Sequence, residues 1–227
     1  MIKAIIFDAF GTLFKVVNGG SARTIMSFIR QAGNVLDEKK FIAEWKAYYK
    51  RKTIYGNFMT ERSIFISRIQ MFYERYNVSR NAEKDADVLL SSAYERGIYP
   101  EVIYSVEELR KKYRVFIGSN TDNDVLHSVM RRNKVSVDGV FTSEDIKCYK
   151  PNIEFYNKIL SRTGLSAQET VFAGDSVTDD VIGAKGAGMK AILIDRNNEY
   201  SVNTADMVLD RLPLPEDIDI IQRVKSE

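Results

Sequence analysis

Short apolar runs rich in β-branched residues, separated by helix-length segments, are the feature that most restricts the fold of this chain. The runs are nearly continuous rather than alternating, which is typical of strands buried on both faces of a parallel sheet. They lie at 3–8, 113–120, 139–143, 170–175 and 190–195, with a weaker run at 207–209. Segments of helical length lie at 122–132, 152–163, 177–187 and 216–224. This alternation predicts an α/β fold, a doubly wound parallel sheet with right-handed crossovers.

The stretch from 16 to 96 interrupts this alternation. It carries long amphipathic segments with no convincing strand between them, near 21–32, 38–52, 60–76 and 83–96. We therefore predict that 1–15 and 97–227 form the α/β core domain and that 16–96 forms an inserted helical-bundle cap domain. Most of the insert's many aromatic residues are expected to form the core of that bundle.

The two crossings between cap and core are predicted at about 15–17 and 96–99. With Gly97 as a hinge, the cap is expected to open and close over Asp8 and to exclude water when closed. The segment 197–206 is predicted to be a loop, because it is rich in turn-forming residues.

Composition narrows the class of partner. The 227 residues include 33 basic and 31 acidic ones, and a formal net charge of +2 favours neither nucleic acid nor a membrane surface. A single cysteine, Cys148, excludes an internal disulfide and fits a reducing compartment. No run of ~18 apolar residues and no secretory signal pattern is visible. We therefore expect a cytoplasmic protein with a small-molecule substrate.

Small polar and charged residues follow the ends of the predicted strands. Asp8 ends the first run, Ser119 and Asn120 end the second, Lys150 follows the third, and Asp175 ends the fourth. Each has a structural explanation as a strand end, a helix cap or a turn. Because ligands of open α/β sheets bind beyond the carboxyl ends of the strands, the four together indicate a functional site.

This order of motifs resembles the haloacid dehalogenase-like (HAD) hydrolase superfamily. The matching pieces are "DAFGTLF" from Asp8, "GSN" at 118–120, "KP" at 150–151 and "GDSVTDDVIGA" from Gly174. The resemblance covers residues 1–14 and 97 to about 210, and the insert is similar to the helical cap of that superfamily. It indicates the fold strongly and the substrate weakly.

The resemblance implies a nucleophilic carboxylate at Asp8, which would form a covalent intermediate with the substrate. In the phosphatase branch, Thr12 and Ser119 would hydrogen-bond the phosphoryl oxygens, Lys150 would neutralise charge, and N–H groups of the turn at Gly11 would assist.

The resemblance also implies Mg²⁺, held by Asp8, Asp175, the carbonyl oxygen of Phe10 and waters, with Asp180, or otherwise Asp179, bracing the metal shell. The predicted substrate contacts are Phe10, Gly11, Asn120, Lys46 and Tyr156.

Phe10 departs from the phosphatase pattern, in which this position is a second aspartate that protonates the leaving group. Phenylalanine carries no proton, so a general-acid contribution of typically ~10²–10⁴-fold is missing or comes from elsewhere. A Mg²⁺-dependent phosphatase would then need good leaving groups or an acid from the cap, and Glu44, Glu61 and the cap tyrosines are candidates.

Dehalogenation is the alternative, because a halide leaves without a proton. Tyr156 matches a dehalogenase spacing, and Lys46 stands in for the cap arginine that holds the substrate carboxylate. Asp175 and Val177 depart from the dehalogenase pattern, however, and Asp175 beside Asp8 would repel an anionic haloacid unless a cation lay between them. Phosphonoacetaldehyde cleavage and non-catalytic phosphate binding also remain open. The balance favours a Mg²⁺-dependent phosphatase of a small anionic phosphorylated metabolite.

Overall fold

The computed structural model describes residues 1–16, 20–200 and 204–223. In this part of the chain a six-stranded, all-parallel sheet has the order β3-β2-β1-β4-β5-β6. The strands are β1 (Ala4–Phe7), β2 (Arg114–Ser119), β3 (Gly139–Thr142), β4 (Thr170–Gly174), β5 (Lys190–Ile194) and β6 (Met207–Leu209). The order reverses between β1 and β4, which is the switch point where such sheets bind ligands. The predicted doubly wound parallel sheet is confirmed.

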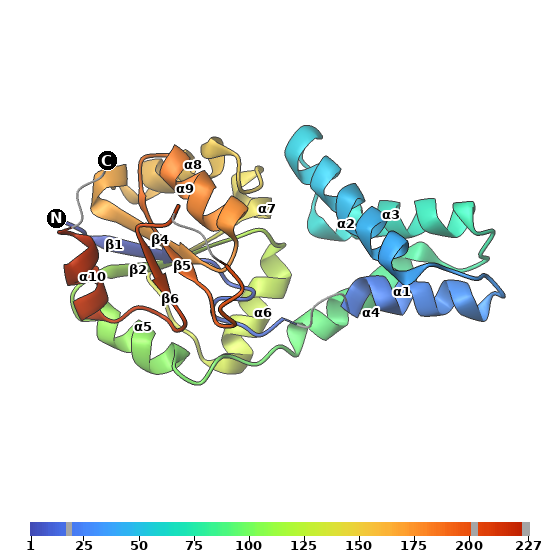
Figure 1. Cartoon of the computed structure of the whole chain (residues 1–227), viewed down its shortest axis with the longest axis horizontal. Helices are drawn as coiled ribbons and strands as arrows, with labels where there is room; N and C mark the ends of the chain where they lie inside the picture. Colours follow the sequence, from blue (N-terminus) through green and yellow to red (C-terminus); the bar gives the residue numbers. More distant parts are fainter. Residues whose placement is uncertain (17–19, 201–203, 224–227) are drawn as a thin grey trace.

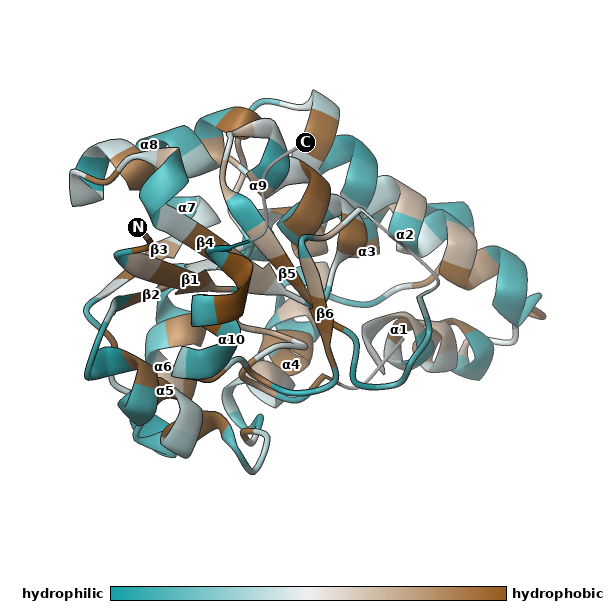
Figure 2. Cartoon of the chain, turned by 60° about the vertical axis from the view of Figure 1, so that its left-hand side comes forward, coloured by the Kyte–Doolittle hydropathy of each residue, from teal (hydrophilic) through white to brown (hydrophobic). Residues whose placement is uncertain are grey.

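Helices cover both faces of the sheet (Figures 1 and 2). One face carries α5 (Val102–Arg110), α6 (Asn123–Asn133) and α10 (Pro215–Ile221). The other carries α7 (Ser143–Ile146), α8 (Ile153–Thr163) and α9 (Gly183–Gly186). Two short turns of helix flank β4, namely the 3₁₀ helix η1 (Ala167–Glu169) and the π-helix η2 (Val177–Ile182).

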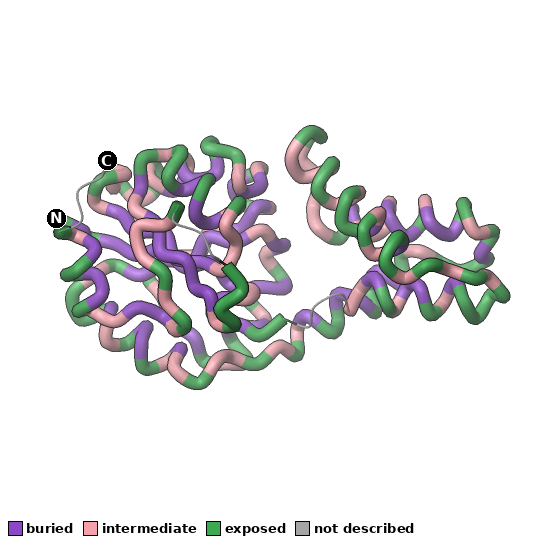
Figure 3. The backbone as a smooth tube through the Cα atoms, viewed as in Figure 1, coloured by how far each residue is buried: buried purple, intermediate pink, exposed green. Residues whose placement is uncertain are grey.

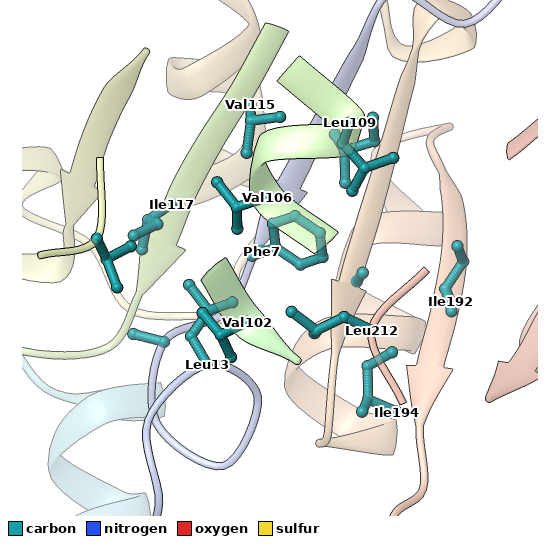
Figure 4. Packing of buried hydrophobic residues seen from close by; sticks show 14 of the residues in the cluster. Phe7, Leu13, Val102, Val106, Leu109, Val115, Ile117, Ile192, Ile194 and Leu212 are labelled. Carbon is teal, nitrogen blue, oxygen red and sulfur yellow. The ribbon is translucent and has the colours of Figure 1, made fainter. Parts of the chain in front are cut away.

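The continuous apolar runs follow from this double coverage. In β1, Ile5 and Phe7 belong to the hydrophobic cluster under α5 and α6, whereas Ala4 and Ile6 belong to the cluster under α8. Successive side chains of a strand point to opposite faces, so a strand covered on both sides must be apolar at every position. Figure 4 shows the first cluster, where Phe7 lies among side chains of α5 and β2.

Helix α5 was not among the predicted helices. Its nine residues begin with a β-branched and aromatic run, and Glu101, the N-cap residue just before the helix, makes no side-chain capping bond. Both features weaken a helix signal. Burial of Val102, Val106 and Leu109 against the sheet stabilises it.

The insert consists of helices with a separate hydrophobic cluster. They are α1 (Gly20–Gln31), α2 (Glu38–Tyr55), α3 (Glu61–Arg75) and α4 (Ala82–Tyr94), and Figures 1 and 3 show them gathered to one side of the sheet. Asp37, Thr60 and Asn81 accept backbone N–H groups at the starts of α2, α3 and α4. The division into core and cap domains at 15/16 and 96/97 stays a prediction.

Aromatic rings fill the centre of this bundle, as expected. The centroid of Phe72 lies 4.6 Å from that of Phe41 and 5.7 Å from that of Trp45, and all three side chains are buried. Tyr55, at the end of α2, is instead largely exposed. The aromatic content of the insert is therefore mainly a packing feature.

The two crossings between insert and sheet run side by side. The N–H of Lys15 donates to the carbonyl of Gly97 (2.9 Å), and Phe14 pairs with Ile98. The predicted crossing at 15–17 reaches residue 17, which lies outside the described residues, as do 201–203 of the predicted loop and 224 of the last predicted helix. No helix among the described residues is long and apolar enough to cross a bilayer.

Candidate active site

Asp8 lies directly beyond β1, where its N–H donates to the carbonyl of Ala173 in β4 (2.9 Å). The chain then turns sharply, and the N–H groups of Leu13 and Phe14 both donate to the Ala9 carbonyl. Gly11 has a φ of +103°, and a Cβ there would overlap the Asp175 carboxylate. This turn therefore requires glycine both for its backbone and for the close approach of Asp175.

Lys150 brings a positive charge to Asp8. Its Nζ lies 2.7 Å from Oδ1 of Asp8 and 2.6 Å from Oδ1 of Asp180, and its side chain is 2% exposed. The Asn120 amide accepts from the Lys150 N–H (2.8 Å) and donates to the Lys150 carbonyl (3.0 Å). Asn120 therefore fixes the backbone that carries this lysine, while the Ser119 hydroxyl donates to Asp8 (3.1 Å).

Carboxylate oxygens of Asp8, Asp175 and Asp180 lie within 4.8 Å of one another. The hydroxyl of Thr12 donates to Asp175 (3.3 Å), and Asp180 accepts the N–H of Ser176 (2.9 Å). Asp180 belongs to the π-helix η2, a rare helix type that often occurs at functional sites. A set of oxygen donors this close suits a hard cation such as Mg²⁺.

Burial and mutual repulsion raise the carboxyl pKa values of this cluster. Burial raises the pKa of Asp175 to about 6, and the charge of Asp8 adds to the shift. Burial likewise raises the pKa of Asp180 to about 7, although Lys150 opposes the shift. Burial alone would lower the pKa of Lys150, but Asp180 and Asp8 raise it above its ordinary value. Lys150 therefore pairs with two of the three carboxylates, Asp8 and Asp180, and an additional cation would relieve the excess negative charge.

A cavity of about 610 Å³ lies between the sheet and the insert. On the sheet side the cavity is lined by Phe10, Asn120 and Thr121. On the insert side it is lined by apolar residues, by Glu61 and by Arg96, which follows α4. A second cavity of about 260 Å³ lies between α2 and the loop that carries Lys150. Both cavities include Asn120, so they adjoin at the end of β2.

The structure distributes the predicted substrate contacts unevenly. Phe10 is half-buried and lines the larger cavity, with the Arg96 guanidinium 4.5 Å from its ring centroid. Tyr156 is fully buried in the core, where its hydroxyl donates to the Asp179 carbonyl. Lys46 is exposed on α2 and lines neither cavity. Neither Tyr156 nor Lys46 lies where a substrate contact was predicted.

Asp122 is a contact between sheet and insert that the sequence did not reveal. Its two carboxylate oxygens accept the N–H groups of Glu61 (2.7 Å) and Arg62 (2.8 Å) at the start of α3. Asp122 also precedes α6, where it reads as an ordinary helix cap. It makes no such capping bond, because both of its carboxylate oxygens accept N–H groups of α3, and the Glu144 carboxylate accepts the N–H of Asn123 (2.8 Å).

Arg96 is a second residue of the cavity that the sequence did not reveal. Among the described residues its guanidinium has no hydrogen bond or ion pair, and it lies over Phe10 in the cavity wall. A lone arginine at the end of a predicted helical segment carries no sequence signal for a site, since such residues usually face solvent.

Comparison with known proteins decides the family. The model of the haloacid dehalogenase-like hydrolases matches residues 2–188, which hold all the motifs at the strand ends. The chain belongs to this family. It is accordingly a hydrolase of the HAD superfamily.

Relatives within the family carry two kinds of activity. A glyceraldehyde 3-phosphate phosphatase of Methanocaldococcus jannaschii is 30% identical over 143 residues, which cover 57% of this chain and 58% of that protein. An (S)-2-haloacid dehalogenase of Burkholderia cepacia is 25% identical over 210 residues, 86% of this chain and 84% of that protein. Identity at this level supports a common family and leaves the reaction open.

Solved structures share the fold over almost the whole chain. The HAD hydrolase YfnB of Bacillus subtilis, solved with bound magnesium and described as revealing interdomain movement, has a TM-score of 0.71. It is 18% identical, and the match covers 98% of this chain and 99% of that one. This likeness supports the fold alone.

Proposed function

We propose that the protein is a Mg²⁺-dependent phosphatase that hydrolyses a small, anionic phosphorylated metabolite through an aspartyl-phosphate at Asp8. The observation that carries this proposal is the cluster of Asp8, Asp175 and Asp180, whose oxygens lie within 4.8 Å of one another, whereas the buried Lys150 pairs with Asp8 and Asp180 and not with Asp175. Such a cluster favours a divalent cation, and with it an anionic phosphoryl group, over a free haloacid.

Asp8, Asp175 and the carbonyl of Phe10 would hold the ion, with Asp180 behind them, and bound Mg²⁺ would offset the charge of the phosphoryl oxygens. A carboxylate oxygen of Asp8 then attacks phosphorus as the bond to the leaving oxygen breaks. Water subsequently attacks phosphorus, and the bond between Asp8 and phosphorus breaks to release inorganic phosphate.

The residues around Asp8 support this chemistry by binding and orienting. Lys150 and Ser119 already bond Oδ1 of Asp8, so the other oxygen is left for the attack. The Ser119 hydroxyl is the donor proposed for the phosphoryl oxygens, because the N–H groups of Gly11, Leu13 and Phe14 already donate to carbonyls within the turn. The Thr12 hydroxyl donates to Asp175 in this structure and so orients that carboxylate. To donate to a phosphoryl oxygen, Thr12 would have to leave Asp175.

The cavity supports a small substrate with an anionic or polar part. Arg96 supplies a cation without a hydrogen-bonded partner among the described residues, and much of the remaining lining is apolar. The phosphatase relative from Methanocaldococcus jannaschii acts on a phosphorylated metabolite of that size, which agrees with the proposal.

Release of p-nitrophenol from p-nitrophenyl phosphate tests the proposal, because this leaving group needs no general acid. We expect turnover in Mg²⁺, its loss in EDTA, and its loss in Asp8→Asn. The matched control is Asp124→Asn, an exposed aspartate on α6 that should keep full activity. Turnover that persists in EDTA or in Asp8→Asn would contradict the proposal.

Dehalogenation is the second candidate. Phe10 supplies no proton, which suits a halide leaving group, and the Burkholderia cepacia relative spans most of the chain. Against it, Asp8 and Asp175 together repel an anionic haloacid. Halide release from 2-chloropropionate that is undiminished by EDTA would favour this alternative over the phosphatase.

A further inference from the structure

Phe10 leaves one role in the proposed reaction unfilled, namely the acid that protonates the leaving oxygen. The sequence offers Glu44, Glu61 and the cap tyrosines. The position of Glu44 excludes it as this acid. It pairs with Arg75 and lines two other cavities, formed by residues of α2 and α3 and their neighbours. The structure leaves Glu61 as the carboxylic acid of the insert that faces the same cavity as Phe10.

Glu61 is held rigidly at the edge of this cavity. It is the first residue of α3, and its N–H donates to the Asp122 carboxylate, which belongs to the sheet side (2.7 Å). Its own carboxylate accepts the Tyr49 hydroxyl at one oxygen and the Thr121 hydroxyl at the other, both at 3.4 Å. These long bonds leave the carboxyl group able to exchange either partner for a substrate oxygen.

Thr121 connects Glu61 to the nucleophile. It lies two residues after Ser119, the last residue of β2, whose hydroxyl donates to Asp8. The carboxyl group of Glu61 therefore lies on the insert side of the segment that follows β2, the strand whose last residue, Ser119, contacts Asp8. In an in-line displacement the leaving group of a phosphate ester points away from the attacking oxygen, and the cavity that Glu61 lines offers room for such a group.

We propose that Glu61 is the general acid and base of this enzyme, in place of the residue that Phe10 does not supply. This inference rests on the proposed phosphatase function. As the bond between phosphorus and the leaving oxygen breaks, protonated Glu61 gives its proton to that oxygen. The Glu61 carboxylate then takes a proton from the water that attacks the phosphorus of the aspartyl-phosphate, which returns Glu61 to its starting form.

The surroundings of Glu61 keep a proton available near neutral pH. Burial raises the pKa of Glu61 to about 7, and the nearby charge of Asp122 adds to the shift, while Arg96 and Arg68 oppose it. Burial raises the pKa of Tyr49 well above its ordinary value, so that tyrosine holds its proton too tightly to match. An acid works best with a pKa close to the working pH, which favours Glu61.

The charged and titratable groups around Glu61 come from each element packed against it. They are Tyr49 on α2, Arg68 on α3, Arg96 after α4, Asp122 before α6, and Tyr149. Burial raises the pKa values of both tyrosines, so neither one ionises near neutral pH. The pKa of Asp180 is also about 7, so a limb near pH 7 reports Glu61 when Glu61→Gln removes it.

Glu61→Gln tests the inference with two esters of similar shape, p-nitrophenyl phosphate and p-methoxyphenyl phosphate. Loss of a general acid should lower kcat/KM for the poorer leaving group by about 10²-fold and spare the better one. The activity of the unaltered protein on p-methoxyphenyl phosphate should fall above pH about 7, since the acid must be protonated, and Glu61→Gln should lack this limb. Glu61→Asp should restore part of the lost rate, and the matched control Glu44→Gln should change neither ester.

Each outcome decides the matter. Equal losses of kcat/KM on both esters would assign Glu61 a structural role, and no loss of kcat/KM on either would exclude it from proton transfer to the leaving group, so both overturn the inference while the phosphatase function stands. If the unaltered protein hydrolyses neither ester in Mg²⁺, the phosphatase function falls and the role of Glu61 falls with it. A retained kcat/KM on p-nitrophenyl phosphate also shows that the Glu61→Gln protein is folded.

Discussion

Replacing Lys150 with methionine isolates the electrostatic core of the site. Lys150→Met keeps the length and apolar stem of the side chain and removes its charge. The ammonium group is 2.7 Å from Asp8 and 2.6 Å from Asp180 and is almost fully buried. Without it, three carboxylates face one another in a buried cluster with no lysine between them.

The cost of this change can be worked from the burial. Breaking a buried ion pair by removing one partner destabilises a protein by about 3–5 kcal/mol, because the remaining charge is stranded. At about 2–4 °C per kcal/mol for a chain of this size, Tm should fall by roughly 6–20 °C in EDTA at pH 8. Both Asp175 and Asp180, with pKa values of about 6 and 7, are largely ionised at that pH.

The pH dependence has a definite sign. Folded-state pKa values of about 6 and 7 are raised, so the folded chain holds protons that the unfolded chain releases. Stability from these groups is therefore present at low pH and is lost as pH rises from about 4 through 7. Lys150 opposes the shift of Asp180, so its removal should deepen this loss. The Tm deficit of Lys150→Met should thus be smaller at pH 5 than at pH 8.

Thermal unfolding followed by circular dichroism measures the effect. Lys158→Met is the matched control, because Lys158 on α8 is partly exposed and pairs with Glu154 at the surface, where such pairs are worth about 0–1 kcal/mol. Mg²⁺ should recover part of the stability of Lys150→Met by binding the freed carboxylates. A loss no larger than that of Lys158→Met, or one that grows toward pH 5, would refute the reasoning.

Further substitutions probe the turn and the contact between sheet and insert. Gly11→Ala should lower kcat at least about 10²-fold, because a Cβ there would displace Asp175. The control is Gly186→Ala, which should leave kcat unchanged because the space around Gly186 is open. A fully active Gly11→Ala would contradict the close approach of the Asp175 carboxylate to Gly11. Asp122→Ala should lower kcat/KM about tenfold or more, because two charge-assisted bonds of about 1.5–3 kcal/mol each hold the start of α3. Small-angle scattering should show a larger radius of gyration for this variant than for Asp124→Ala, and equal radii would exclude Asp122 as a clamp.

The sheet was predictable from sequence because its physical requirement is local. Strands such as Ala4–Phe7 are covered on both faces, and that coverage demands an apolar residue at every position. Asp8 and Asp175 could be placed together for the same reason, since residues after parallel strands share one edge of the sheet. The starts of α2, α3 and α4 are marked in the sequence by residues that favour the N-cap position, namely Asp37, Thr60 and Asn81.

The residues that depend on contacts between distant segments could not be placed in advance. Nothing in the spacing of Glu61 separates it from Glu44, since both are acidic residues on amphipathic helices. Only the packing of α3 against the end of β2 puts Glu61 beside Thr121. Tyr156 matched a spacing but is buried under η2, because helix orientation rather than spacing decides which face a side chain occupies.

The central claim is a covalent phosphoryl-enzyme at Asp8, and acid quenching during turnover of p-nitrophenyl phosphate tests it most directly. Peptide mass spectrometry of the quenched protein should find one phosphoryl group on Asp8 in Mg²⁺ and none in EDTA. Turnover with no phosphoryl group on Asp8, or with the group on another residue, would contradict the account.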